Sequence, residues 1–236
     1  MFKFILIFVI VIVVLFIHQH KLRIKWHTFF KKGFRVETGP WGVYCYDGKQ
    51  GSFKTYSIIE FLLQNKDKRI YSNMTSIKGV KYTPIDGIDE LLSLRSEHDC
   101  IIFFDEIFTA ITKSSKVNAD LEVMDFLSQM RKRHIIFLTT AQEWLELDIT
   151  LRRYCRYRIH CEPYQLFKGL FTIIKKEFYD AEHMHWSNDE NEYVAPLLET
   201  TISKPNLYVA NSYDTFETIK PTRKSSRAIK LKKVNL

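Results

Sequence analysis

The chain has 236 residues, which suits one α/β domain of ordinary size with extensions at its ends. Apolar residues make up 46% of the sequence, enough for a full hydrophobic core, so a chain that is disordered throughout is excluded. The net charge of +8 leaves two interpretations open: an anionic partner such as nucleic acid or lipid head groups, or a solvated basic surface.

The N-terminus carries an unbroken apolar run of fourteen residues, Phe4 to Ile17. A run without a polar face favours a retained membrane anchor over a buried helix, and no small-residue cleavage site for a signal peptide follows it. Basic residues gather after the run, between Lys21 and Arg35, which predicts that the remaining chain lies in the cytoplasm. We therefore expect a single-pass membrane protein, bound to the membrane through its N-terminal helix.

Buried strands and helices alternate in the middle of the chain. Strands are predicted at residues 43–46, 69–72, 100–104, 135–139, 158–160 and 170–178. Helices are predicted at residues 54–65, 88–94 and 121–132. The runs at 100–104 and 135–139 are apolar on both faces, as in a parallel sheet covered by helices on its two sides. The order predicts a doubly wound α/β sheet.

The segment between the first strand and the first helix has the features of a phosphate-binding loop. Backbone N–H groups and the helix dipole at such a position face an anion. Lys54 would neutralise the β- and γ-phosphates of a nucleotide, and the Thr55 hydroxyl would bind Mg²⁺. An ordinary glycine turn before a helix is the alternative. The nucleotide-binding candidates are Gly48, Lys49, Gln50, Gly51, Ser52, Phe53, Lys54 and Thr55.

Phe53 departs from the loop pattern GxxxxGK[ST], which has glycine at this position. Glycine lets the backbone approach the phosphates without a Cβ atom. The phenyl ring must therefore point away from the nucleotide, or the loop must shift and use Gly51. We expect the ring to turn outward, against the first helix or a neighbouring subunit.

The strand at 100–104 is followed by two carboxylates, Asp105 and Glu106. Asp105 would accept a hydrogen bond from a Mg²⁺-bound water, which makes Thr55 and Asp105 the metal candidates, and Glu106 would polarise the attacking water. An acidic helix start is the alternative, since both residues suit that position. The phosphate loop upstream favours the catalytic interpretation.

Three further residues flank the strand at 135–139. Gln142 follows it, and a polar residue there can contact the γ-phosphate because parallel sheets bind ligands at their carboxyl edge. A surface helix cap is the alternative for Gln142. Arg131 and Arg133 precede the strand, and one of them could reach a neighbouring subunit's nucleotide as an arginine finger. A basic surface patch is the alternative for the arginines.

Taken together, these residues resemble the zonula occludens toxin family, a phage branch of the FtsK–HerA-type ATPases. The likeness runs from about Val43 to Cys161 and includes the segments Arg69–Asn73 and Leu151–Arg153. It implies an ATP-driven motor with ATP and Mg²⁺ as cofactors, assembled as a homo-oligomeric ring. Such a motor would package phage DNA or drive virion assembly and extrusion, with phage capsid or assembly proteins as partners. The predicted anchor would then lie in the host inner (cytoplasmic) membrane or in a virion membrane.

The sequence thus divides into five segments. They are a transmembrane anchor (1–20), a basic juxtamembrane segment (21–40), a P-loop ATPase domain (41–180), a C-terminal extension (181–219) and a basic tail expected to be disordered (220–236). The two basic segments could contact DNA phosphates or lipid. A second hypothesis is a non-hydrolysing membrane adaptor that recruits DNA or a protein partner, should Phe53 weaken nucleotide binding.

Overall fold

The computed structural model describes residues 2–19, 22–24, 41–107, 117–145, 147, 149–166, 171–189 and 191–214. Its strands are β1 (Leu22–Ile24), β2 (Gly42–Asp47), β3 (Arg69–Ser72), β4 (Thr83–Pro84), β5 (Cys100–Phe103), β6 (Ile136–Ala141), β7 (Cys155–Leu166), β8 (Phe171–Asp180), β9 (His185–Ser187), β10 (Glu192–Val194) and β11 (Leu197–Ser203). Its helices are α1 (Phe2–Gln19), α3 (Lys54–Gln64), α4 (Gly87–Ser93), α6 (Val117–Ser128), α7 (Ile149–Arg152) and α8 (Leu207–Ala210), with 3₁₀ turns η1 (Leu94–Ser96) and η2 (Ala181–His183).

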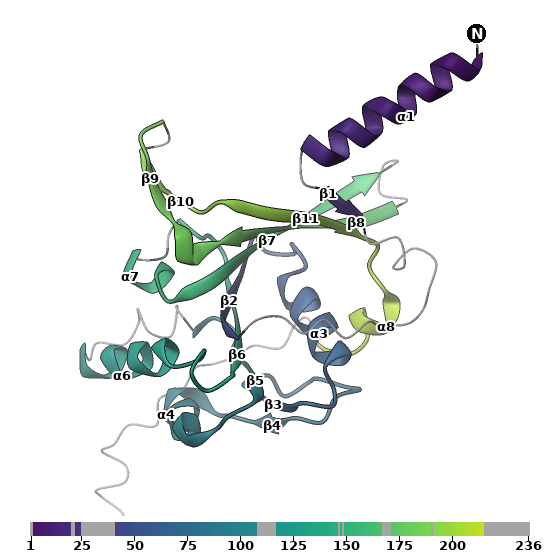
Figure 1. Ribbon diagram of the computed structural model, residues 1–236. Helices are drawn as coiled ribbons and strands as arrows, with labels where there is room; N and C mark the ends of the chain where they lie inside the picture. The colour runs from purple at the N-terminus through teal and green to yellow at the C-terminus, as the bar shows by residue number, and fades with distance from the viewer. Residues whose placement is uncertain are drawn as a thin grey trace, which may run out of the picture.

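One mixed sheet of nine strands organises the chain, in the order β1-β11-β8-β7-β2-β6-β5-β3-β4 (Figure 1). From β7 to β4 every neighbouring pair is parallel. β8 runs antiparallel to both β7 and β11, and β1 is parallel to β11. Because β6 separates β2 from β5, the strand that feeds the phosphate loop is not a direct neighbour of the strand that precedes the acidic pair.

Helices cover both faces of the parallel part of the sheet. On one face α3 buries Ile59 against a cluster that includes Ile101 of β5. On the other face α4 and α6 bury Leu91 and Phe126 against a cluster that includes Ile102. Consecutive residues of β5 therefore enter opposite clusters, as the alternation of side chains along a strand requires. The predicted α/β architecture, with helices on both faces of parallel strands, is confirmed.

Several predicted elements differ in extent from those observed. The helix expected at 121–132 is α6, Val117–Ser128. The strand expected at 158–160 is the much longer β7, whereas the strand expected at 170–178 is β8, displaced by one or two residues at each end. β7 and β8 pair along ten residues of each strand, and this cross-strand pairing stabilises residues whose own pattern is weak. Strands β1 and β11, at 22–24 and 197–203, extend the sheet where the residue pattern predicts no strand.

The prediction of a transmembrane segment, and with it of a single-pass membrane location, is wrong. In the part of the chain that the structure describes, no helix has both the length and the apolar character needed to cross a membrane. The apolar run does form a helix, α1, but α1 has 18 residues and includes Lys3, His18 and Gln19. At a rise of about 1.5 Å per residue the fourteen apolar residues reach about 21 Å, less than the roughly 30 Å of a hydrocarbon core.

Most of the predicted basic juxtamembrane segment, 21–40, and all of the predicted basic tail, 220–236, lie outside the described residues.

A buried ion pair joins α3 to the antiparallel part of the sheet. Lys176 Nζ on β8 donates to Glu60 Oε2 on α3 at 2.9 Å. The two side chains are 6% and 12% exposed, so both charges have lost most of their water. Desolvated charges are tolerated when they are paired, and removing one partner leaves the other uncompensated. The pair therefore fixes α3, which begins at Lys54, against β8.

We expect Lys176→Met to lower the free energy of unfolding by about 3 kcal/mol, because Glu60 would remain buried without its cation. The double variant Lys176→Met/Glu60→Leu should recover most of this loss, since it removes both charges. Urea denaturation of the three proteins measures the effect. Lys175→Met is the matched control: its ion pair with Glu177 is more exposed, and the expected loss is below about 1 kcal/mol. Equal losses in the single and double variants would contradict the interpretation.

Candidate nucleotide site

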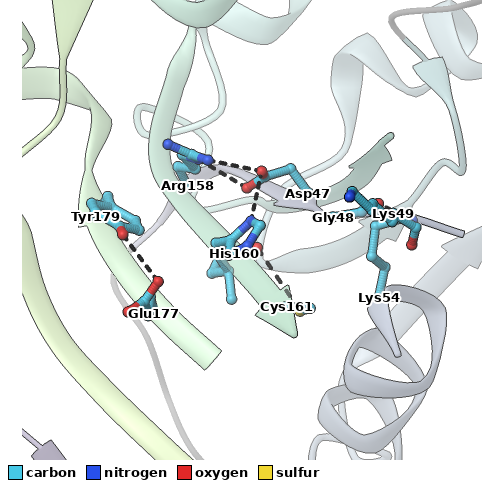
Figure 2. A network of polar contacts seen from close by, with 10 residues as sticks. Asp47, Gly48, Lys49, Lys54, Arg158, His160, Cys161, Glu177 and Tyr179 are labelled. Atoms are coloured by element: carbon cyan, nitrogen blue, oxygen red, sulfur yellow. Dashed lines mark hydrogen bonds and ion pairs between the residues drawn. The ribbon is translucent and has the colours of Figure 1, made fainter. Parts of the chain in front are cut away.

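The phosphate loop leaves the end of β2 and enters α3, and β7 packs directly against its first residue (Figure 2). Gly48 follows Asp47, the last residue of β2, and has a φ of 139°. A Cβ atom on Gly48 would lie 2.5 Å from the carbonyl oxygen of Cys161 on β7 and 2.6 Å from Ser52 Oγ. Since one of these atoms belongs to the backbone, a side chain could be accommodated only by moving β7 or the loop. Gly48 is therefore required by the packing of the loop.

The Lys54 ammonium folds back over the loop. Its Nζ donates to the carbonyl oxygens of Gly48 at 2.5 Å and of Lys49 at 2.9 Å. Burial lowers the pKa of Lys54, while the negative charges of Asp105 and Glu106 act in the opposite direction. The structure thus brings Lys54 close enough to the acidic pair for their charges to interact, across the carboxyl edge of the parallel strands.

The polar atoms of the loop suit a phosphate group. Ser52 Oγ is buried and has no hydrogen-bond partner among the described residues. The Lys54 ammonium donates its two loop hydrogen bonds to neutral carbonyl oxygens, so an anion would be the stronger partner. Thr55 lies in the first turn of α3, and with Asp105 it offers the oxygen ligands that Mg²⁺ prefers. The residues present therefore fit both a nucleotide phosphate and a magnesium ion.

Phe53 occupies the backbone conformation that favours glycine. Its φ of 67° and ψ of 24° are left-handed, and it stands directly before the first residue of α3. The ring packs edge-to-face on Tyr56 in the first turn of α3, with ring centroids 5.5 Å apart and an angle of 88° between the planes. A non-glycine residue in this region costs about 1 kcal/mol. The aromatic contact offsets part of that cost and holds the ring against α3.

The acidic pair follows β5 and is held by two neighbouring strands. The Asp105 carboxylate accepts a hydrogen bond from the Thr140 hydroxyl of β6. Burial raises the pKa of Asp105, although the bond from Thr140 opposes the shift. The Glu106 side chain is exposed, its φ is 52°, and its backbone N–H donates to Thr140 Oγ1 at 3.3 Å. One hydroxyl therefore orients both acidic residues.

Asn73 is a second anchor of the acidic pair that residue patterns alone did not assign. Its Oδ1 accepts from the Asp105 N–H at 2.8 Å, and its Nδ2 donates to the Asp105 carbonyl oxygen at 3.3 Å. Asn73 follows β3 and Thr140 lies near the end of β6, the two strands that flank β5. Asn73 and Thr140 could have been predicted from the sequence, because each is a polar residue at or near the carboxyl end of a buried parallel strand. The same criterion predicted a role for Gln142.

The remaining candidates lie at opposite edges of the sheet. Gln142 directly follows β6, is exposed, and is adjacent to Ala141, which pairs with Asp47 of β2. Arg131 and Arg133 precede β6 at its amino end, where Arg131 Nη1 pairs with Glu182 at 2.7 Å. The structure therefore brings Gln142 to the phosphate loop and does not bring the two arginines to the nucleotide site of their own chain.

No protein-family model and no curated protein sequence matches the chain. Among solved structures it is similar to the N-terminal domain of zonular occludens toxin from Neisseria meningitidis, with 14% identity and a TM-score of 0.41 over 75% of this chain and 100% of that one. It is also similar to the genome packaging NTPase B204 from Sulfolobus turreted icosahedral virus 2, with 13% identity and a TM-score of 0.42 over 69% of this chain and 100% of that one. A third match is the flagellar accessory protein FlaH from Methanocaldococcus jannaschii, with 12% identity and a TM-score of 0.45 over 70% and 94% of the two chains. The family that the sequence resembles is thus found again among the similar structures.

The two loop glycines provide a matched pair of variants. Gly48→Ala should reduce ATP affinity by about tenfold or more, because the new Cβ would displace the loop from its position on Cys161. Gly51→Ala should reduce it by less than about threefold: the φ of Gly51 is 78°, but no atom lies within 4 Å of a Cβ there. Isothermal titration with ATP measures both. A weaker effect for Gly48→Ala than for Gly51→Ala would show that the contact with β7 does not shape the loop.

Phe53→Gly should retain nucleotide binding, because glycine adopts the left-handed conformation at this position without a steric cost. Phe53→Val should lose affinity, since a β-branched side chain is strongly disfavoured there and loses the contact with Tyr56. Fluorescent ATP-analogue titration distinguishes the two. If the parent chain does not bind nucleotide and Phe53→Gly does, the phenyl ring blocks the site and this interpretation of the loop is wrong.

Proposed function

We propose that the chain is a Mg²⁺-dependent ATPase of the P-loop class that works on phage DNA, in packaging or in virion assembly and extrusion. One observation carries the ATPase proposal: a phosphate loop that admits only glycine at its start faces an acidic pair fixed by neighbouring strands. The loop supplies Gly48 and Lys54, and Asn73 and Thr140 fix Asp105. Both parts lie at the carboxyl edge of the same parallel strands, where such sheets bind ligands.

Each residue has a distinct task in this proposal. Lys54 exchanges its loop carbonyl partners for the β- and γ-phosphate oxygens, and the loop N–H groups and the start of α3 hold the β-phosphate. Thr55 and Asp105 would hold a magnesium ion, which neutralises charge on the phosphates when bound. Glu106, exposed beside Asp105, accepts a proton from the attacking water. Gln142 contacts the γ-phosphate from the end of β6.

Assembly of several copies accounts for the position of the two arginines. Arg131 and Arg133 lie at the amino edge of the sheet, so either could act only on the nucleotide of another copy. An arginine supplied by a neighbouring subunit stabilises the charge that develops during phosphoryl transfer. A ring of identical chains, in which each amino edge faces the next phosphate loop, would satisfy this arrangement. The proposal of phage DNA as the substrate rests on the sequence resemblance and on the net charge of +8.

The test is ATP hydrolysis by the purified chain, with and without Mg²⁺ and with and without DNA. Lys54→Ala should lose nucleotide affinity, because it removes the cation that faces the phosphates. Glu106→Gln should bind ATP as the parent does but lower kcat by about a hundredfold or more, since the amide cannot accept the proton.

Glu90→Gln, on the exposed surface of α4, is the matched control and should change neither property. Equal turnover in Glu106→Gln and the parent would remove Glu106 from its role. ATP binding by the parent without turnover would favour the non-hydrolysing adaptor.

A further inference from the structure

A buried carboxylate stands at the root of the phosphate loop (Figure 2). Asp47 directly precedes Gly48, and its side chain is 2% exposed. It accepts two hydrogen bonds from Arg158, Nε to Oδ1 at 2.9 Å and Nη2 to Oδ2 at 3.0 Å. His160 Nδ1 lies 3.0 Å from the same Oδ2. Burial disfavours the charged form, but the hydrogen bonds from His160 and Arg158 lower the pKa of Asp47, so the residue remains a carboxylate.

Arg158 also contacts two aromatic rings. Its guanidinium carbon lies 5.5 Å from the ring centroid of Trp144 and 5.0 Å from that of Tyr179. Trp144 is fully buried and comes two residues after Gln142, whereas Tyr179 lies on β8 and donates to Glu177 at 3.1 Å. A single side chain of β7 thus contacts the root of the phosphate loop, the segment after β6, and β8.

The pairing of the strands makes this position important. Asp47 is opposite both Ala141 of β6 and His160 of β7, so Gly48 and Gln142 leave the sheet side by side. Beyond that point neither segment belongs to the sheet, and hydrogen bonds between strands no longer fix one relative to the other. Arg158 connects the two segments, because it donates to Asp47, which precedes Gly48, and contacts Trp144, which follows Gln142.

We propose that Arg158 is a positioning residue for ATP hydrolysis, which fixes Gln142 relative to the phosphate loop by holding Asp47 on one side and Trp144 on the other. This inference rests on the proposed ATPase function. Only arginine can fill the role, because its planar group donates two parallel hydrogen bonds to a carboxylate while its faces stack on rings. Lysine would keep the positive charge but would lose both the two parallel hydrogen bonds and the stacking on the rings.

Substitution of Arg158 should lower the turnover of ATP rather than the affinity for ATP. The groups that hold the β-phosphate, Lys54 and the loop N–H groups, remain when Arg158 is changed. The position of Gln142 matters for the γ-phosphate in the transition state, where a shift of about 1 Å can cost a hundredfold in rate. Arg158→Lys should therefore lower kcat for ATP hydrolysis by about tenfold or more and change ATP affinity by less than about threefold.

The matched control is Arg95→Lys, the same substitution at an exposed arginine that faces Glu122 on α6, far from the loop in the sequence and at the surface. It should leave kcat and affinity unchanged. Should Arg158→Lys unfold, Tyr179→Leu keeps the bidentate pair with Asp47 and removes one of the two rings, and it should lower kcat by about threefold. Thermal denaturation of every variant separates lost turnover from lost folding.

A double-mutant cycle with Gln142 tests the route of the effect. If Arg158 acts by positioning Gln142, Arg158→Lys should reduce kcat by less than about twofold in a Gln142→Ala background. Independent, additive losses would overturn the inference, and so would an unchanged kcat in Arg158→Lys. A loss of ATP affinity that accounts for the whole effect would overturn it as well.

The parent and Glu106→Gln are measured in the same assay. A parent that does not hydrolyse ATP overturns the proposed function and this role with it. A parent that hydrolyses ATP while Arg158→Lys equals it overturns only the role of Arg158.

Discussion

The central position of β2, paired in parallel with β6 on one side and β7 on the other, is the constraint on which the site depends. A parallel strand with two parallel neighbours has its carboxyl end at the same edge as theirs. That edge therefore receives the start of the phosphate loop from β2, Gln142 from β6 and the backbone of Cys161 from β7. The contact between Cys161 and Gly48 is possible only because β7 continues past the last residue of β2.

The two aspartates of the site, Asp47 and Asp105, differ in how their charge is balanced. Asp47 is surrounded by donors, and hydrogen bonds from His160 and Arg158 overcome the effect of burial and lower its pKa. For Asp105 burial dominates and raises the pKa, despite the bond from Thr140. A cation placed beside Asp105 would remove this penalty, whereas Asp47 already has its cations. The first carboxylate thus suits a structural role and the second suits a ligand of a metal ion.

Much of the parallel part of the sheet could be predicted from the sequence, because its strands are short apolar runs and its helices are amphipathic. β3 was placed at its observed residues, and β2, β5 and α3 within one residue at each end. The edge strand β1 and its neighbour β11 could not be predicted in the same way. The segment Leu197–Ser203 contains Glu199, Thr200 and Thr201, and its strand conformation depends on pairing with β8, a partner that local patterns do not identify. In the site, the loop and the acidic pair were visible as motifs, but Asn73, Thr140 and the network around Asp47 depend on which strands become neighbours.

Both borders of the nine-stranded sheet are formed by very short strands. β4 has two residues, one of them Pro84, and β1 has three. A long edge strand presents a row of unpaired N–H and C=O groups to other chains. The short edge strands β1 and β4 present few such groups, and Pro84 has no N–H donor at all. Copies of this chain are therefore poorly suited to join sheet to sheet into a continuous fibre.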